Sequence, residues 1–208
     1  MKSILCLIFS LVFMTTVFAQ VETDMVDTNE GNQNFFGVQG YTVNNLVHFK
    51  DSWKDGSGFY ATYGSISKSN HWSLIFQTGY FSFNANPDAG FTGDEHFEII
   101  PLQVGTRYYI TLDRFRPFLL AMSGLNIINA KYKVTVPDPD QEGVEEEIDI
   151  DGSEVKANFQ VGLGLGILLF SNLEIEGQFK YNSHLIEPSL PYNITGLEYG
   201  VALNWHLR

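Results

Sequence analysis

The clearest pattern along this chain is a strict alternation of apolar and polar residues in its C-terminal part. Over 197–207 every second residue is large and apolar, and the residues between them are polar or small. The segments 173–184 and 154–169 alternate in the same way, the first against charged residues and the second mainly against glycines. A period of two puts the two sets on opposite faces of a β-strand. These three segments are therefore predicted to be strands with one apolar face.

Further strand-like runs begin at Phe35. We predict eight strands, over about residues 35–47, 58–67, 71–83, 96–110, 116–133, 154–169, 173–184 and 195–207. Short connections lie at 68–70, 111–115 and 170–172, and long polar ones at 48–57, 84–95, 134–153 and 185–194. An even number of strands joined by short and long connections in turn is typical of an eight-stranded antiparallel transmembrane up-and-down barrel. The first two runs alternate less cleanly, so their faces stay unassigned.

The N-terminus predicts export. A basic Lys2 precedes an apolar run from Ile4 to Met14, and small residues lead to Ala19, which is the plan of a secretory signal peptide over 1–19. Residues 20–34 then form a polar, acidic tail, and 35–208 the barrel. Cys6 is the only cysteine, so the exported chain would have no thiol. That excludes disulfides, cysteine metal sites and thiolate catalysis.

Charge and length narrow the class further. The 208 residues carry a net charge of −12, which argues against nucleic acid as a partner because few cations can neutralise phosphates. The longest later apolar stretch, 162–170, is too short for a membrane helix. If the chain enters a membrane, it must do so as a closed barrel, in which every backbone group is paired.

Alternation alone also fits a soluble exported lipocalin-like barrel that binds an apolar ligand. Two further observations favour the membrane. The polar face carries small residues that suit a crowded interior, namely Gly162, Gly164, Gly166, Gly200 and Ala202. Aromatic residues near strand ends predict two interfacial girdles, with Trp72, Tyr108, Tyr109, Phe115, Phe170 and Trp205 near the short turns and Phe81, Phe83, Tyr132, Tyr181 and Tyr199 near the loops.

The polar faces predict the contents of the lumen. The candidate polar network comprises Gln103, Arg107, Glu174, Glu176, Gln178, Lys180, Glu198 and Asn204. Buried charges have to be paired, so we expect ion pairs that involve Arg107, Lys180 and the three glutamates. A lumen filled in this way would be closed, with a narrow polar path for water or ions as the alternative. No catalytic residue, metal ligand set or cofactor is predicted.

The most distinctive connection is the acidic one over 134–153. With its flank it holds nine acids: Asp138, Asp140, Glu142, Glu145, Glu146, Glu147, Asp149, Asp151 and Glu154. Alternation continues on both sides of it, so this hairpin is expected to project beyond the membrane as a two-stranded ribbon. The acids predict a solvated loop; the alternatives are calcium binding, divalent cations that bridge the loop to lipopolysaccharide, or a surface ligand held by 134–153.

Four segments, 99–110, 116–127, 159–169 and 197–207, resemble those of the small OmpA/OmpX-like outer-membrane β-barrel proteins. The resemblance implies the outer membrane of a Gram-negative bacterium, with short turns and termini on the periplasmic side and long loops outside. It also implies membrane lipids and lipopolysaccharide as surroundings. The last run resembles the signal read by the barrel-assembly machinery, although Leu207 replaces the usual terminal aromatic and Arg208 follows it.

The resemblance is specific for fold and compartment and says little about function, because one barrel scaffold carries many activities. Our functional prediction is a non-enzymatic protein that is structural or binds through its loops. Some small outer-membrane barrels are lipid A deacylases, and Ser183 and His184, with Glu187 nearby, lie at the corresponding strand end. We disfavour this reading because neighbouring residues on a strand point to opposite faces, so Ser183 and His184 are poorly placed to pair. The order of residues typical of those enzymes is also absent.

Overall fold

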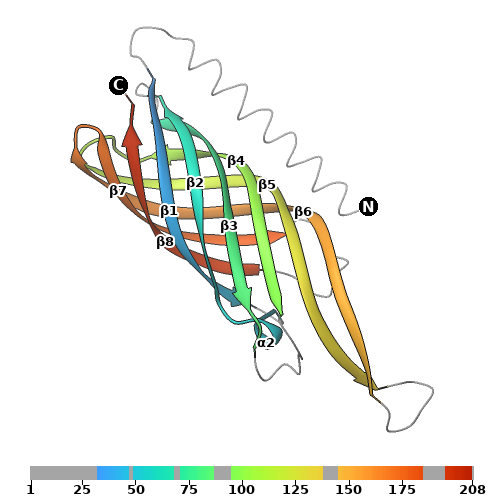
Figure 1. Ribbon diagram of the computed structural model, residues 1–208. Coiled ribbons are helices and arrows are strands. Elements are labelled where there is room, and N and C mark those ends of the chain that lie inside the picture. The colour runs from blue at the N-terminus through green and yellow to red at the C-terminus, as the bar shows by residue number, and fades with distance from the viewer. Residues whose placement is uncertain are drawn as a thin grey trace.

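The computed structural model describes residues 32–46, 49–67, 71–86, 95–137, 145–184 and 195–207. These residues form a closed antiparallel barrel of eight strands in sequence order (Figure 1). The elements are β1 (Gln33–Leu46), α2 (Phe49–Ser52), β2 (Gly56–Ile66), β3 (Trp72–Asn84), β4 (His96–Tyr109), β5 (Phe115–Pro137), β6 (Glu145–Phe170), β7 (Leu173–His184) and β8 (Thr195–His206). The predicted signal peptide and most of the acidic tail lie outside the described residues.

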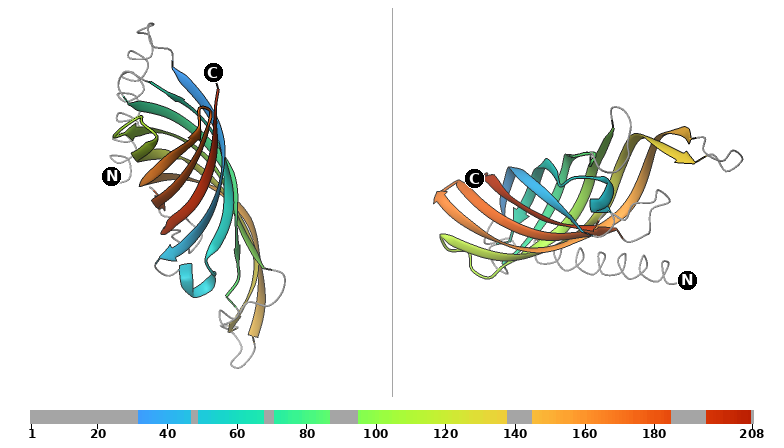
Figure 2. Two further views of the ribbon diagram at one scale, coloured as in Figure 1. Left: turned by 90° about the vertical axis from the view of Figure 1, so that its left-hand side faces the viewer. Right: turned by 90° about the horizontal axis from the view of Figure 1, so that it is seen from below.

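The barrel closes because β1 pairs with both β2 and β8. Directly paired residues can be followed around the wall from Ser153 in β6, through β5 to β1, and back through β8 and β7. The path returns to β6 at Leu163, ten residues further along the strand. Such a stagger requires the strands to tilt against the barrel axis, as the views in Figure 2 show.

The predicted strands are confirmed. The strands β5 and β6 extend into the segment 134–153, which was predicted to be a loop. Their pairing continues to Pro137 and Glu145, so the hairpin projects past the other strands as a ribbon (Figures 1 and 2). The backbone pairing there includes Val134 with Ile148. The one-turn helix α2, within the expected loop 48–57, was not predicted.

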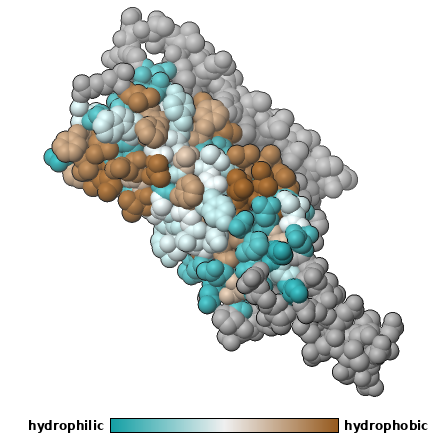
Figure 3. Space-filling view, viewed as in Figure 1, coloured by the Kyte–Doolittle hydropathy of each residue, from teal (hydrophilic) through white to brown (hydrophobic). Residues whose placement is uncertain are grey.

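The outward face of the barrel is apolar and the inward face carries the charges. Leu203 and Trp205 in β8 are 52% and 46% exposed, whereas Glu198 on the same strand is 1% exposed. On the face shown in Figure 3, apolar residues form patches on both sides of a paler middle. A lipocalin-like barrel would have the opposite arrangement, with an apolar cavity inside. In β1, Phe35 points inward and Phe36 outward, which assigns the faces that the sequence left open.

The prediction of two aromatic girdles is wrong for four residues. Tyr109, Phe81, Phe83 and Tyr132 are all buried inside the barrel. They share the inward side of their strands with polar lumen residues, and alternation along a strand outweighs closeness to its end. Trp72, Tyr108, Phe115, Phe170, Tyr199 and Trp205 are exposed on the outside as expected, and Tyr181 is half-buried.

Two apolar clusters lie inside the barrel, one near each end. We call the end that carries the connection 110–114 the turn end, and the end that carries α2 the loop end. At the turn end, Phe35, Tyr109 and Phe118 belong to one cluster. At the loop end, Trp53 joins inward aromatic residues of several strands. Polar side chains fill the length between the two clusters. No helix among the described residues is long and apolar enough to cross a membrane.

Candidate functional site: the polar interior

All eight predicted lumen residues point into the barrel. They lie on β4 (Gln103, Arg107), β7 (Glu174, Glu176, Gln178, Lys180) and β8 (Glu198, Asn204), and none is more than 6% exposed. The period of two explains their placement, because each lies an even number of positions from the other inward-facing residues of its strand. Seven of them contact other polar side chains. Asn204 makes no side-chain hydrogen bond among the described residues.

Toward the turn end, Arg107 is the centre of the first group of contacts. Its Nη1 lies 2.5 Å from Glu176 Oε1 and also donates to the Tyr109 hydroxyl at 3.0 Å. The guanidinium lies over the ring of Phe118, with Cζ 4.2 Å from the ring centroid. The apolar cluster at the turn end thus shields an ion pair and also contacts its cation through a ring face.

Glu174 has two cationic or potentially cationic partners that the sequence analysis missed. Arg116 Nη1 lies 3.1 Å from Glu174 Oε2, and His206 Nε2 lies 2.8 Å from the same oxygen. The sequence held a signal for both partners. His206 is separated from Glu198 and Asn204 by an even number of positions and so shares their face of β8, and Arg116 shares the inward face of β5 in the same way. This group joins β5, β7 and β8 at the turn end.

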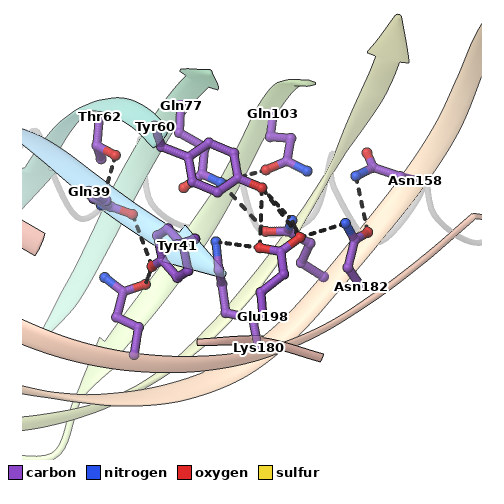
Figure 4. Close-up of polar contacts among 12 residues, drawn as sticks. Gln39, Tyr41, Tyr60, Thr62, Gln77, Gln103, Asn158, Lys180, Asn182 and Glu198 are labelled. Carbon is purple, nitrogen blue, oxygen red and sulfur yellow. Dashed lines mark hydrogen bonds and ion pairs between the residues drawn. The ribbon is translucent and has the colours of Figure 1, made fainter. Parts of the chain in front are cut away.

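Lys180 and Glu198 form the second group, at the middle of the barrel (Figure 4). Lys180 Nζ lies 3.1 Å from Glu198 Oε2. The ammonium also lies over the rings of both Tyr41 and Tyr60, 4.1 Å from each centroid. Two aromatic faces and one carboxylate therefore surround a lysine that is completely buried.

Glu198 has a fuller set of partners than Lys180. Asn182 Nδ2 donates to its Oε1 at 2.7 Å and Gln160 Nε2 at 3.1 Å, while the Tyr60 hydroxyl donates to Oε2 at 3.2 Å. These donors come from β2, β6 and β7, so one carboxylate connects strands on different sides of the barrel (Figure 4). Buried carboxylates need such donors to offset their lost hydration.

Neutral amides and hydroxyls fill the space around the charges. Gln77 Nε2 donates to Gln103 Oε1 at 2.5 Å, and Gln39 Nε2 donates to Thr62 Oγ1 at 2.8 Å. Two contacts connect the groups: the Tyr41 hydroxyl donates to Gln178 Oε1, and Gln178 Nε2 donates to Glu176 Oε2 at 2.6 Å. The Arg107 group and the Lys180–Glu198 group are therefore linked.

The buried charges of the described residues balance. Arg107, Arg116 and Lys180 face Glu174, Glu176 and Glu198. Glycines make room for them: at Gly166 a Cβ would overlap Glu174 Oε1, and at Gly164 it would overlap the ring of Phe118. His206 is a further partner of Glu174. Removal of any one of these charges would leave its partner buried without compensation.

The proposed deacylase residues do not form a catalytic set where the structure describes them. Ser183 Oγ lies 3.3 Å from Thr195 Oγ1, a hydroxyl and not a base. The side chain of His184 and the whole of Glu187 lie outside the described residues. Within that part of the chain, no group of three or more His, Cys, Asp or Glu side chains could hold a metal ion.

Much of the acidic loop also lies outside the described residues. Asp138, Asp140 and Glu142 are not described at all, and the side chains from Glu145 to Asp149 are not described either. Of the remaining acids, Asp151 is exposed and Glu154 pairs with Lys156.

No protein-family model and no curated protein matches the chain. Several solved structures do match the chain. Neisserial surface protein A has 14% identity and a TM-score of 0.54 over 85% of this chain and 99% of its own. OprG of Pseudomonas aeruginosa has 12% identity and a TM-score of 0.53 over 85% and 96%. A major outer membrane protein of Thermus thermophilus has 11% identity and a TM-score of 0.52 over 83% and 99%.

The chain has the fold of a small outer-membrane β-barrel. This confirms the fold expected from the resemblance to OmpA/OmpX-like barrels. The match spans nearly the whole of each similar chain, so the eight strands described here correspond to the complete barrel fold of those proteins. One barrel scaffold carries many activities, so the function has to be argued from the side chains of this chain.

Proposed function

We propose that this protein is a non-enzymatic barrel of a Gram-negative outer membrane, with a closed lumen and a structural or loop-mediated binding role at the cell surface. One observation carries the placement in a membrane. Each strand has a large apolar side chain exposed on the outside: Phe36, Phe59, Phe76, Leu102, Leu119, Leu163, Ile175 and Leu203. A continuous apolar belt around a charged interior is costly in water and favourable in hydrocarbon.

In this proposal the turn end faces the periplasm and the loop end faces outward. The projecting ribbon of β5 and β6 supports this orientation, since long extracellular and short periplasmic connections are the rule for such barrels. The surroundings are then membrane lipids and lipopolysaccharide. The alternating apolar residues of β8 support assembly by the barrel-assembly machinery, and the ribbon with its acidic tip is the best candidate for contact with a surface ligand.

The closed lumen rests on three layers of side chains. The linked polar network lies between the two apolar clusters. At the loop end Trp53 is fully buried, with its ring 5.3 Å from Phe97 and 5.9 Å from Tyr132. A bridge from Trp53 to Ala85 extends the pairing of β2 with β3 and fixes the segment that carries the tryptophan at the loop end. The hollow beside Glu198 is about 10 Å³, room for about one water molecule.

The location is tested by fractionation. The protein should remain with outer membranes after washing in high salt, and its electrophoretic mobility should change when the sample is boiled, because a closed barrel resists detergent at room temperature. Recovery in the soluble periplasmic fraction, with the same mobility before and after boiling, would contradict the proposal.

The closed lumen is tested in planar bilayers. The inserted protein should show no stable stepwise conductance. The variant Trp53→Ala should also be silent, because the polar network beneath Trp53 still fills the barrel. Large stable channels in the unaltered protein would rule out a closed lumen, whereas channels in Trp53→Ala alone would show that the tryptophan by itself closes it.

A further inference from the structure

The outer wall of the barrel has a hollow over β2 and β3. It is open to the surface and has a volume of about 600 Å³. Ala61 and Thr78, which are directly paired across the two strands, form its floor. Phe36 and Leu102 on the flanking strands also line it. The outer wall is therefore concave at this place.

Two aromatic pairs border the floor. On the side of the turn end, Tyr63 is paired with Phe76. On the side of the loop end, Phe59 is paired with Tyr80, with ring centroids 6.5 Å apart. All four lie on the outward parity of their strands, as do Ala61 and Thr78. Small residues between two large pairs leave a trough, whereas four similar side chains in a row would give a flat wall.

A polar row lies immediately beyond the second aromatic pair. Thr42, Ser57, Ser82 and Glu98 are direct neighbours on β1 to β4 and share the outward face. The Tyr80 hydroxyl donates to Glu98 Oε1 at 2.6 Å. This row limits the apolar belt on the loop side. The trough lies on the apolar side of that limit.

We propose that this trough holds one acyl chain of an outer-membrane lipid, an inference that rests on the membrane placement proposed above. Water is a poor occupant, because the outward side chains on the floor and the near rim offer it few polar partners. An empty trough loses dispersion contacts on both sides. A flexible hydrocarbon chain can lie in this open apolar trough and keep its polar end near the row of hydroxyls. A second copy fits less well, because the polar row cuts short the apolar surface that a stable interface needs.

The test compares two substitutions of the same kind. Ala61→Phe fills the floor of the trough. Ala157→Phe places the same ring on the outward face of β6, which lies away from the trough. Each protein is reconstituted into nanodiscs of phosphatidylethanolamine and phosphatidylglycerol and released in a native mass spectrometer. The unaltered protein and Ala157→Phe should keep one bound lipid, and Ala61→Phe should lower that retained fraction by roughly tenfold.

Insertion is checked on the same samples by the mobility change on boiling. If all three proteins insert and retain lipid equally, the inference about the trough is wrong while the membrane placement stands. A dimer that Ala61→Phe abolishes would also overturn it, in favour of a second copy of the chain. If the unaltered protein does not insert at all, the membrane placement itself fails.

Discussion

The buried charged side chains in the lumen differ in how many hydrogen-bond and charge partners they have. Lys180 has one carboxylate and two aromatic faces, whereas Glu198 accepts hydrogen bonds from Asn182, Gln160 and Tyr60 in addition to its contact with the lysine. Removal of one partner from a buried ion pair leaves the other charge without compensation. The cost therefore depends on which charge is left behind.

We predict that Glu198→Gln lowers the free energy of unfolding by about 3–5 kcal/mol. Lys180→Met should cost at least about 1 kcal/mol less, because three donors still serve the carboxylate. The measurement is urea unfolding in lipid vesicles, followed by tryptophan fluorescence. The double variant serves as a control and should recover part of the loss. A greater loss for Lys180→Met would contradict the asymmetry.

At the scale of single residues, the sequence was sufficient to predict whether a side chain points into or out of the barrel. It was insufficient to predict which side chains contact each other across the lumen. All eight predicted lumen residues point inward, since alternation is a property of the single strand. The predicted pairing of Arg107 with a glutamate is present, but Glu174 pairs with Arg116 and His206. Which side chains meet across the lumen depends on strands far apart in the sequence.

The element that differs from the rest is the ribbon of β5 and β6. Among the described residues, β5 beyond Lys131 and β6 before Asn158 pair only with each other. Lys131 lies directly opposite Asp151, a favourable cross-strand charge arrangement. The ribbon is thus stabilised locally and adds little to the closure of the barrel.

Replacing residues 133–149 with Asn-Gly tests this independence. The two residues form a tight hairpin turn between Tyr132 and Ile150, which are direct partners. Because Tyr132 and its contact with Trp53 remain, the free energy of unfolding should change by no more than about 0.5 kcal/mol. The measurement is unfolding in vesicles, with the boiling-dependent mobility as a check of folding. A clearly larger loss would show that the ribbon supports the barrel.

For the molecule as a whole, the position of the apolar belt on the barrel decides how it lies in a membrane. The polar row that begins at Thr42 on β1 and reaches Glu98 on β4 continues through direct partners on the next two strands. These are Asn129 on β5 and Ser153 on β6. On β6 the outward residues from Val155 toward the turn end are apolar. In the proposed membrane placement, the row therefore marks the outer limit of the surface that hydrocarbon covers.

This limit predicts a contrast between two arginine substitutions on one strand. Leu163→Arg, within the belt, should lower the free energy of unfolding in vesicles by about 2–4 kcal/mol, whereas Ser153→Arg should cost about 0–1 kcal/mol. Both residues are outward on β6, so their lumen contacts are unaffected. Equal costs for the two variants would show that the belt ends elsewhere.

The sequence by itself determined the strands, their order and the face on which most side chains lie. Backbone stereochemistry imposes a period of two on each strand separately, and an apolar set of residues must find an apolar medium. Tertiary structure alone decided the ten-residue stagger and, through it, which residues from distant strands meet. It brought Arg116 to Glu174 and packed Trp53 against Phe97 and Tyr132 at the loop end. It also set Ala61 beside Thr78. Those contacts depend on how the sheet closes into a barrel. The stagger at which it closes is set by the pairing of all eight strands together.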